Sequence, residues 1–525
     1  MGESEIEYID CRLVILDETR IEYSDHYNLK ALGTVSKDPL IRKTIERFVH
    51  FIDKYGNPYD DGGCKGEDLE VLGQHLYNLL FTDKREIHPD TNQETSVRYC
   101  FLTAYQNFEK ARKNNERLRL RVILNFHQKA DELAGLPWEF IRVPWEPQGF
   151  FLAGKKTELI LTRCVPEAEV GETLDPGERP LKILIARSAP PGIDSVEAND
   201  AVQYILSLNK PGIVEVDKLE NPSLSDIKSR LEKRPHIFHF IGHGRASLHE
   251  PPAVALFRER KDIDRDEENL TAKQKRDGVS VDKVAWVEST TFAELFKEHP
   301  PRLVFLHACK GAASGYKFHN TARDLIKAKV PAVVAMQFEI TNEDANTFAQ
   351  KFYQNIDAGL SVDEAVSEGR WELGSPQGRR GAWNDRGFGT PVIYLQAKGP
   401  LISPRLHDPS SGEKRDDDTA GLARQRCPYA CKRGWIAIPL DVNFCWDCKQ
   451  PLAACPNCKR IITPGFCNKC GEVKEGGTSA VTAAPQVAVS DSQLQPGTPS
   501  NRDPLQPPPE SAKPNQVDIR AGRIQ

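Results

Sequence analysis

The sequence predicts an α/β protein with a mostly parallel β-sheet flanked by helices. The alternation of two sequence patterns carries this prediction. Between residues 181 and 396, short apolar runs rich in β-branched residues alternate with stretches that have the apolar spacing of amphipathic helices. Such alternation is typical of βαβ units, whose parallel strands are buried by helices on both faces.

Each element of this region follows from its own pattern. The predicted strands are Leu181–Ala186, Ile213–Val216, His236–Ile241, Leu303–Ala308, Ala332–Ala335 and Val392–Leu395. The predicted helices are Val196–Leu208, Leu224–Leu231, Phe292–Lys297, Ala322–Ala328, Ala345–Ile356 and Val362–Leu373. Residues 258–289 are rich in both charges and interrupt the alternation, so we expect a projecting loop or hairpin there.

The N-terminal region has a less regular pattern. Leu69–Phe81 and Thr103–Leu118 have the spacing of amphipathic helices, and Leu118–Leu124 reads as a strand. We therefore assign residues 1–135 to a mixed α/β region, whose later part belongs with the domain of residues 136–398.

Composition and charge exclude several classes of protein. The 525 residues suffice for roughly two to four domains. The 70 Lys and Arg nearly balance the 75 Asp and Glu, which excludes a globally basic nucleic-acid coat. No apolar run approaches the ~18–20 residues of a membrane span, and the acidic N-terminus lacks the apolar segment of a signal peptide. We expect a cytoplasmic protein without a membrane span.

The cysteines are unevenly distributed. Eight of the thirteen form close pairs, a pattern that in the cytosol indicates metal binding rather than disulfides. They make two sets of four: Cys427, Cys431, Cys445 and Cys448, then Cys455, Cys458, Cys467 and Cys470. Four thiolates satisfy a tetrahedral zinc ion and leave no open position for catalysis. We therefore predict two structural zinc ions in residues 427–473.

This cysteine-rich block resembles a double zinc ribbon, a module that binds protein or nucleic acid. Its slightly basic balance does not select nucleic acid, so a protein activator or sensor is the favoured partner. The polar, charged residues 399–426 read as a linker. Residues 474–525 contain no aromatic side chain and are rich in Pro, Ser, Gln and Ala, which predicts a disordered tail.

Two predicted strands run into reactive side chains. One leads to His243, which is flanked by Gly242 and Gly244, and the other leads to Cys309. Functional groups gather at the carboxyl ends of parallel strands, so if these strands are neighbours, the two side chains face each other. The imidazole can then take the thiol proton and later protonate a leaving amine. The backbone N–H groups of Gly244 and Cys309 are the candidate oxyanion donors.

Each of these residues also has a plain structural interpretation. A lone cysteine at the end of a buried strand is usually an inert small hydrophobe, and a lone histidine is usually a satisfied core residue. Their joint occurrence at two strand ends is more specific. The order of the two, with His some tens of residues before Cys, is that of caspases.

Two segments around these residues carry a family resemblance. Residues 239–244 (His-Phe-Ile-Gly-His-Gly) and 306–309 (Leu-His-Ala-Cys) resemble the signature motifs of CHAT-domain proteases, a separase-like branch of the caspase clan. His307 stands where that family commonly has Asn. The resemblance implies a caspase-like fold, with Cys309 as nucleophile and His243 as base.

The resemblance extends beyond the two motifs, over roughly residues 69–396. Residues 136–141 with 149–153 resemble the entry segment of the same domain, and residues 330–349 resemble its strand and helix after the cysteine. It implies a cysteine endopeptidase that cuts a protein substrate. Our hypothesis is that the zinc ribbon regulates this protease and that it acts in bacterial stress or defence signalling. The alternative is a catalytically inactive caspase-fold scaffold that binds partners through the ribbon. Retention of both catalytic positions favours the enzyme.

The resemblance also suggests a specificity determinant. Separase-like proteases often place an acidic side chain in the pocket for the residue before the cut, and Glu339 and Asp344 fall where that acid would lie. A carboxylate pairs well with a guanidinium, so the expected preference is for Arg. Alternatively, both acids cap the helix that begins near residue 344.

Overall fold

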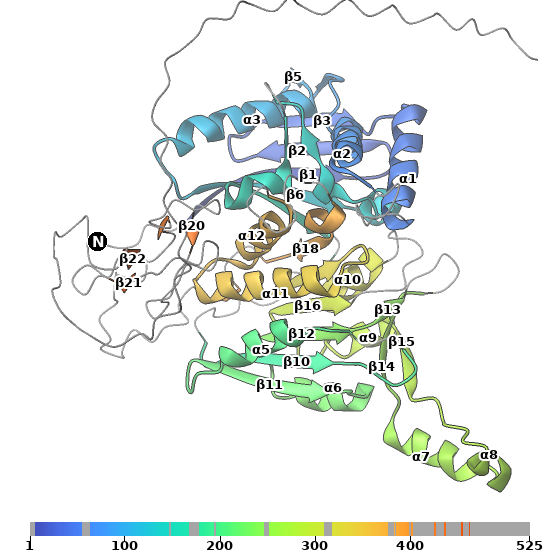
Figure 1. Ribbon diagram of the computed structural model, residues 1–525. Coiled ribbons are helices and arrows are strands. Elements are labelled where there is room, and N and C mark those ends of the chain that lie inside the picture. The colour runs from blue at the N-terminus through green and yellow to red at the C-terminus, as the bar shows by residue number, and fades with distance from the viewer. Residues whose placement is uncertain are drawn as a thin grey trace, which may run out of the picture. The chain divides into compact units, whose positions relative to one another are not determined.

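Eleven of the described strands pair into one sheet in the computed structural model (Figure 1). From edge to edge they are β11 (Val214–Glu220), β10 (Leu181–Arg187), β12 (Ile237–Gly242), β16 (Leu303–Ala308), β17 (Ala332–Met336), β18 (Pro391–Leu395), β9 (Leu159–Cys164), β6 (Leu118–Phe126), β1 (Glu7–Ile15), β2 (Arg20–Asp25) and β3 (Lys30–Thr34). The strands from β11 to β17 are parallel. A second parallel block, from β18 to β1, meets β17 antiparallel. The predicted α/β class is confirmed.

The structure describes most of the chain up to residue 402 and little beyond it. The described ranges are 6–54, 64–145, 149–166, 178–193, 196–245, 251–308, 318–375, 385–397 and 401–402, the single residues 168 and 383, and four dipeptides at 425–426, 435–436, 453–454 and 461–462. Contacts divide the chain into two units, residues 1–414 and 415–525.

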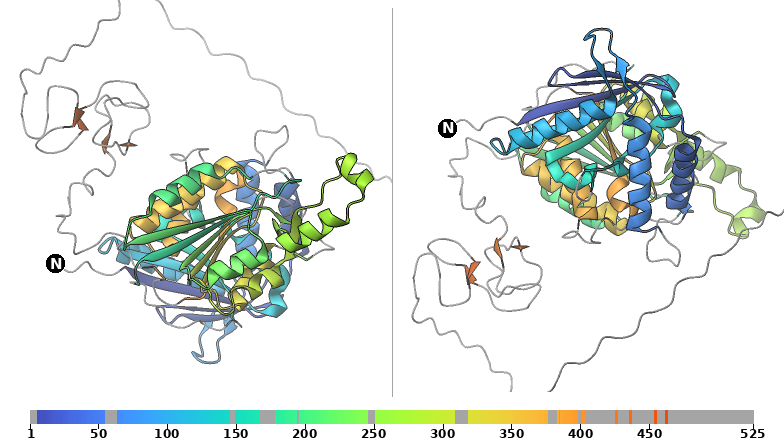
Figure 2. Two further views of the ribbon diagram at one scale, coloured as in Figure 1. Left: turned by 90° about the horizontal axis from the view of Figure 1, so that it is seen from below. Right: turned by 90° about the horizontal axis from the view of Figure 1, so that it is seen from above.

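Helices cover both faces of the parallel strands (Figure 2). Those on one face are α5 (Asn199–Ser207), α11 (Asn342–Asp357) and α12 (Val362–Gly374), and those on the other are α6 (Leu224–Leu231), α9 (Ser289–Glu294) and α10 (Phe318–Lys327). Successive residues of a strand point to opposite faces of a sheet. Ile237 and Ile241 of β12 accordingly join the hydrophobic cluster of the first face, whereas Phe238 and Phe240 join that of the second.

The observed elements match the predicted ones best where the apolar pattern is strongest. β16 and α6 have the predicted bounds, and the other elements predicted between residues 181 and 396 differ at their ends. The helix expected at Thr103–Leu118 is α3 (Val97–Arg112), because Ser96 caps it: its Oγ accepts a hydrogen bond from the backbone N–H of Tyr99 at 3.2 Å.

The N-terminal region is richer in structure than the sequence indicated. It contributes β1, β2, β3 and β6 to the main sheet, together with α1 (Pro39–Lys54) and α2 (Gly66–Leu80). The shorter elements of this unit are β4 (Glu86–Ile87), β5 (Glu94–Thr95), η1 (Gln128–Ala130), α4 (Asp131–Ala134), η2 (Trp138–Phe140), β7 (Arg142–Val143), β8 (Phe150–Phe151), η3 (Leu152–Glu158) and η4 (Arg386–Gly389).

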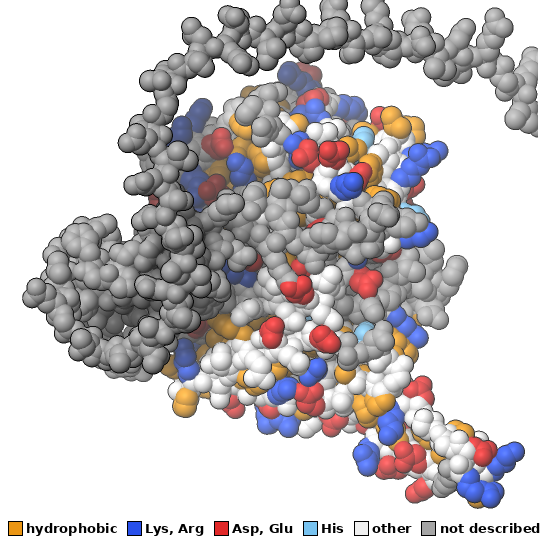
Figure 3. Space-filling view, viewed as in Figure 1, with side chains coloured by type: hydrophobic (Ala, Val, Ile, Leu, Met, Phe, Trp, Pro, Cys, Tyr) orange, Lys and Arg blue, Asp and Glu red, His pale blue; other side chains and the backbone are white. Residues whose placement is uncertain are grey.

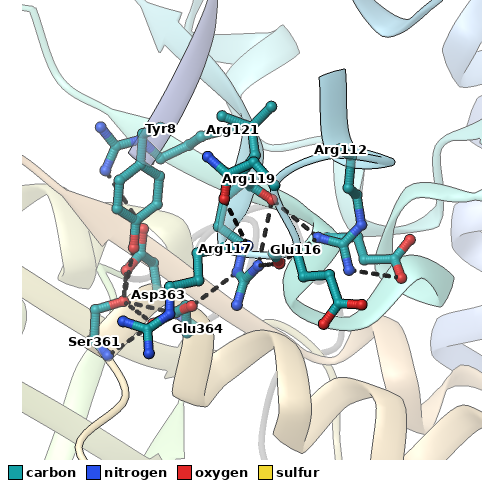
Figure 4. A network of polar contacts seen from close by, with 12 residues as sticks. Tyr8, Arg112, Glu116, Arg117, Arg119, Arg121, Ser361, Asp363 and Glu364 are labelled. Atoms are coloured by element: carbon teal, nitrogen blue, oxygen red, sulfur yellow. Dashed lines mark hydrogen bonds and ion pairs between the residues drawn. The ribbon is translucent and has the colours of Figure 1, made fainter. Parts of the chain in front are cut away.

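A polar network joins β1 and β6 to the N-terminus of α12 (Figure 4). The hydroxyl of Tyr8 lies 3.0 Å from Oγ of Ser361, the N-cap of α12. Arg119 on β6 donates from Nε to Glu364 at 3.0 Å. Arg121 pairs with Asp10 at 2.8 Å. Acids in the first turn of a helix, such as Glu364, are stabilised by the helix dipole. The ion pair between Arg119 and Glu364 also ties a strand of residues 1–135 to a helix more than two hundred residues later in the chain.

A second, fully buried network centres on Glu139 in the entry segment. Its carboxylate accepts hydrogen bonds from both Nε and Nη2 of Arg163 on β9 and from Nε2 of Gln337, which follows β17, at 2.8 Å. Glu139 and Arg163 have side-chain exposures of 0% and 1%. Removing one partner of such a pair typically costs ~3–5 kcal/mol, because the other charge is left buried and unpaired. The network therefore fixes the entry segment against the centre of the sheet.

The charged insertion forms a projecting hairpin arm, as expected. β14 (Ala253–Phe257) and β15 (Val284–Glu288) pair antiparallel, and β13 (Gly244–Arg245) adds a third strand. Beyond them α7 (Arg260–Asn269) and α8 (Ala272–Arg276) extend away from the main sheet (Figure 1). Acidic and basic side chains are interspersed on this arm (Figure 3). Hereafter "the arm" means residues 258–283.

The second unit is described only at two short hairpins. β19 (Gln425–Arg426) pairs with β20 (Trp435–Ile436), and β21 (Ala453–Ala454) pairs with β22 (Ile461–Ile462), both antiparallel. In the described part of the whole chain, no helix has the length and apolar content required to cross a bilayer.

Candidate active site

The strands that carry the two candidate catalytic residues are direct neighbours. β12 and β16 pair in parallel, and the last matched residues are Gly242 and Ala308. His243 is the next residue of the first strand and Cys309 the next residue of the second. The two strands therefore end at the same edge of the sheet. Cys309 itself, with residues 310–317, lies outside the described residues.

His243 leaves its strand through a tightly packed turn. A Cβ atom on Gly242 would lie 2.8 Å from the ring of Phe240 and 3.1 Å from the carbonyl oxygen of Ser188, so a larger residue does not fit without a shift. The carbonyl of His243 accepts a hydrogen bond from the N–H of Ala255 on β14 at 2.9 Å. Ser188 donates from Oγ to the carbonyl of Ala255 at 2.7 Å. His243 is 6% exposed, and its carbonyl is held by the strand that Ser188 in turn contacts.

The ladder between β13 and β14 sets the direction of the Gly244 N–H. Residues opposite each other in an antiparallel pair alternate between hydrogen-bonded and non-hydrogen-bonded positions. Because Ala255 donates to His243, the next pair, Gly244 with Val254, occupies a non-hydrogen-bonded position. The Gly244 N–H therefore points away from β14, which leaves it directed away from its own sheet, as an oxyanion donor requires.

Two further histidines lie below this edge, in the interior of the main sheet. His239 and His307 are each 0% exposed, and their ring centroids are 6.0 Å apart. Nδ1 of His239 lies 3.0 Å from the hydroxyl of Tyr353 on α11. Burial lowers the pKa of His239 well below its usual value and that of His307 to about 4. Both rings are therefore neutral near pH 7, and they pack as core residues on the face covered by α11.

The two candidate specificity acids occupy different environments. Asp344 is 4% exposed and sits in the first turn of α11, where its N–H donates to Oγ1 of the N-cap Thr341 at 3.1 Å and its Oδ2 accepts from that hydroxyl at 2.9 Å. The capping interpretation therefore describes Asp344. Glu339 is exposed and precedes the helix.

Glu339 follows β17, the strand parallel to β16 on the side away from β12. It therefore lies at the same edge of the sheet as His243. The mostly buried Arg386 is near it: burial lowers the pKa of this guanidinium, and the charges of Asp53 and Glu339 partly offset that effect.

The eight predicted zinc ligands, Cys427, Cys431, Cys445, Cys448, Cys455, Cys458, Cys467 and Cys470, lie outside the described residues. Within the described part of the chain, no cluster of His, Cys, Asp or Glu side chains has the geometry of a metal site.

Sequence reasoning missed the residues that support the catalytic edge. Ser188 follows β10 and was not singled out, although it stands at a strand end like His243. Arg245 and Trp286, which meet on the small sheet, lie in segments without a clear strand pattern. Glu139 belongs to the entry segment of residues 136–141, and its signal is a single acid within an otherwise apolar run.

Comparisons with known proteins agree with the motif analysis. A family model described as the CHAT domain matches residues 72–416. No curated protein matches the sequence. Among solved structures, a chain of the Saccharomyces cerevisiae separase–securin complex aligns at 10% identity with a TM-score of 0.39, and the match covers 75% of this chain and 30% of that one.

Two bacterial protease structures align to a similar extent. The Arg-specific cysteine proteinase gingipain R aligns at 10% identity and a TM-score of 0.34, covering 77% of this chain and 80% of that one. A structure of the complex between the pro-domain and the mature domain of RgpB from Porphyromonas gingivalis aligns at 11% identity with a TM-score of 0.33. The match covers 70% of this chain and 78% of that one. The chain thus spans about 30% of the length of the yeast chain that it matches.

Proposed function

The chain belongs to the CHAT-domain family, and on that basis we propose that it is a cysteine endopeptidase in which His243 activates Cys309. One observation carries the proposal: β12 and β16 are adjacent and parallel, with Gly242 opposite Ala308. In the sequence, the next residues are His243 after the first strand and Cys309 after the second.

The proposed reaction uses the two side chains in sequence. The imidazole of His243 takes the proton of the Cys309 thiol, and the thiolate attacks the scissile carbonyl. The C–N bond then breaks, and the imidazolium gives its proton to the leaving amine. Water, deprotonated by the same imidazole, hydrolyses the thioester and releases the acid product and the thiol.

Two backbone N–H groups are available to stabilise the intermediate. The Gly244 N–H points away from its own ladder, and the Cys309 N–H belongs to the nucleophile's residue. A donor aimed at the developing oxyanion is typically worth ~3–4 kcal/mol in the transition state.

The tight turn of His243 supports the enzyme over the inactive scaffold. The backbone around His243 is fixed by the tight packing of Gly242 and by the hydrogen bond from Ala255, whose carbonyl accepts a hydrogen bond from the buried Ser188. A scaffold has no need to immobilise a histidine beside a cysteine at a sheet edge. Preorganisation of this kind is what general acid–base catalysis requires.

We assign the specificity for the residue before the cut to Glu339 rather than Asp344. Asp344 is buried and engaged with Thr341 at the start of α11, whereas Glu339 is exposed at the edge that carries His243. A carboxylate there selects a basic side chain, and Arg in particular, because the guanidinium binds it in a bidentate manner.

The C-terminal cysteines are proposed to hold two structural zinc ions. In the sequence, Cys427 and Cys431 stand between the paired strands β19 and β20, and Cys455 and Cys458 stand between β21 and β22. This is the arrangement of a zinc knuckle. The ribbon is proposed to bind a protein activator or sensor that controls a cytoplasmic protease in bacterial stress or defence signalling.

Metal analysis of the full-length protein tests the zinc proposal. We expect about two zinc ions per chain, and about one after replacing Cys455 and Cys458 by Ser, since four ligands are needed for each tetrahedral site. Elemental analysis of protein purified without chelators measures both values. Equal zinc content in the parent and the variant would show that these two cysteines are not ligands.

The dyad is tested by the pH dependence of thiol alkylation. An imidazolium beside a thiolate lowers the pKa of the thiol, from about 8.5 to below about 7. The rate of iodoacetamide labelling at Cys309 should therefore be half-maximal below about pH 7 in the parent and near pH 8.5 in His243→Ala. Mass spectrometry of the tryptic peptide of residues 303–310 isolates this cysteine.

Other cysteines serve as internal controls for this labelling. Burial raises the pKa of Cys11 and of Cys64 to about 12, so neither thiol reacts at neutral pH in the folded protein. If the labelling profile of Cys309 is the same with and without His243, the two residues do not form a dyad.

A further inference from the structure

The segment that carries Glu339 is buried on both sides of this acid. Gln337, Phe338 and Ile340 are 6%, 4% and 6% exposed, whereas Glu339 is exposed. The ring of Phe338 packs near that of Phe140 in the entry segment, with the centroids 6.1 Å apart. The segment is therefore packed into the protein around a single exposed carboxylate.

Gln337 uses both ends of its side-chain amide and its backbone to hold this segment. Its Nε2 donates to Oε2 of Glu139 at 2.8 Å and also to the carbonyl of Gly389. Its Oε1 accepts a hydrogen bond from Nη2 of Arg163 at 3.2 Å. Its backbone N–H donates to the carbonyl of Thr390 at 2.9 Å. These hydrogen bonds fix Gln337 between β9, the entry segment and the residues that precede β18.

The partners of Gln337 are themselves held by charge. Glu139 is paired with Arg163, and its Oε1 lies 3.6 Å from Nη2 of Arg370 on α12. These three side chains have exposures of 0–1%. Arg370 also donates from Nε to the carbonyl of Pro391, the first residue of β18, at 2.9 Å. Separating buried charges from their partners is costly, so the network gives Gln337 a fixed point of attachment.

The position of Gln337 determines what this attachment does for Glu339. Because the two residues are separated only by Phe338, fixing the first limits the movement of the second. A guanidinium binds a carboxylate best through two parallel N–H···O bonds, which require a fixed orientation of the carboxylate. An ammonium group is a point charge that pairs with a carboxylate in many orientations. A fixed Glu339 therefore favours Arg over Lys.

We propose that Gln337 is a positioning residue that holds the Glu339 segment so that Arg is selected over Lys before the cut. This inference rests on the proposed protease function and deepens its specificity. Because Gln337 is buried in the network, it acts through the backbone of the segment rather than by contact with a substrate. If the network served only the stability of the fold, its loss would slow cleavage of Arg and Lys peptides by the same factor.

Gln396 provides a matched control for Gln337. It follows β18 as Gln337 follows β17, and because these strands are antiparallel, the two glutamines lie at opposite edges of the sheet. Gln396 is 9% exposed, its Oε1 accepts from the N–H of Val165 at 3.1 Å, and its Nε2 donates to the carbonyl of Val165 at 2.6 Å. Gln396→Met therefore removes buried hydrogen bonds of the same kind at a site remote from Glu339.

Peptide pairs that differ only in Arg or Lys before the cut test the proposal in the full-length protein. We expect kcat/KM to be about tenfold higher for Arg than for Lys in the parent, a difference of ~1.4 kcal/mol. In Gln337→Met this ratio should fall to about threefold or less, because the Arg peptide loses the fixed carboxylate and the Lys peptide does not need it. In Gln396→Met the ratio should stay within about twofold of the parent value.

A double-mutant cycle identifies Glu339 as the target of the effect. In the Glu339→Ala background, Gln337→Met should change the Arg-to-Lys ratio by less than about twofold, because no carboxylate remains to be positioned. Thermal unfolding shows which variants are folded, and Gln337→Asn, which retains a shorter amide, replaces Gln337→Met if the latter does not fold. A ratio near one in the parent, an unchanged ratio in Gln337→Met, or an equal loss in Gln396→Met would overturn the positioning role.

Binding measurements separate failure of this role from failure of the protease function. Fluorescence anisotropy of the same peptides, labelled with a dye, on full-length Cys309→Ala measures the preference for Arg without any cleavage. If the parent cuts neither peptide but this preference is present and falls in Gln337→Met, the positioning role stands and the proposed catalytic activity falls. If both peptides are cut and the preference does not depend on Gln337, the catalytic activity stands and the positioning role falls.

Discussion

Cys309→Ala and His243→Ala are each expected to lower kcat/KM for a cleaved peptide by on the order of 10⁴-fold, and the double variant should be no slower than the slower single variant. The reason is that the two side chains act as one unit. Without the imidazole the thiol is mostly protonated and the leaving amine has no acid, and without the thiol the imidazole has nothing to activate. Steady-state kinetics on the same peptide measures all three variants.

The folded state should survive both substitutions. His243 does not belong to the hydrophobic clusters of the described residues, and Cys309→Ala removes only one sulfur atom, so the loss of packing should be small compared with that of a core truncation. Unchanged thermal unfolding would establish this for each variant. Cys164→Ala is the matched control, because this partly exposed thiol lies at the end of β9, on another strand, and should retain activity.

Multiplicative losses in the double variant would contradict the dyad, because independent residues contribute additively in free energy. Residual activity of Cys309→Ala near that of the parent would remove the nucleophile assignment altogether.

The parallel part of the sheet was predictable because its strands are buried on both faces. β10, β12, β16 and β17 are near-continuous runs of Val, Ile, Leu, Phe and Ala, a composition that is typical of parallel strands. The order in which these strands lie side by side in the sheet could not be predicted from the apolar pattern. It depends on which helices pack on which face, and only the observed order makes Gly242 the partner of Ala308.

The residues that support the site were harder to predict because their roles depend on distant partners. The single acid Glu139 gains its meaning only from Arg163 and Gln337, which are brought to it by β9 and by the end of β17. Arg245 and Trp286 lie 41 positions apart and meet because two alanines separate them on β14. Neither relationship leaves a periodic signal in the sequence.

The alternative roles of the two acids were separable only with the structure. In the sequence, Glu339 and Asp344 are two acids near the predicted start of a helix, and either could serve as a cap or as a specificity determinant. Asp344 is the third residue of α11 and is hydrogen-bonded to Thr341, whereas Glu339 lies three residues before the first residue of the helix. Local capping therefore accounts for one acid and leaves the other to be explained.

Fluorogenic peptides that end in Arg are expected to be cut more than a hundredfold faster than those that end in Asp, and Glu339→Ala should remove most of this ratio. Glu339 is exposed in the free protein, and a bound substrate side chain would cover it. Its carboxylate would then attract a guanidinium and repel a second carboxylate, and a charge buried without a partner costs several kcal/mol. Glu339→Lys should reverse the sign of the local field and abolish cleavage after Arg. The measured quantity is the ratio of kcat/KM values for two peptides that differ only in the residue before the cut.

Asp344→Ala is the control variant that distinguishes the role of Glu339 from that of Asp344. Loss of the hydrogen bond that its Oδ2 accepts from the Thr341 hydroxyl should lower the free energy of unfolding by about 1 kcal/mol, while the Arg-to-Asp ratio stays within about twofold of that of the parent. Arg386 is a second partner for the Glu339 charge, so Glu339→Ala should also destabilise the protein slightly. If the ratio collapses in Asp344→Ala and persists in Glu339→Ala, the two acids have the opposite roles. Efficient cleavage after apolar or acidic residues in all of these variants would show that neither acid sets the specificity.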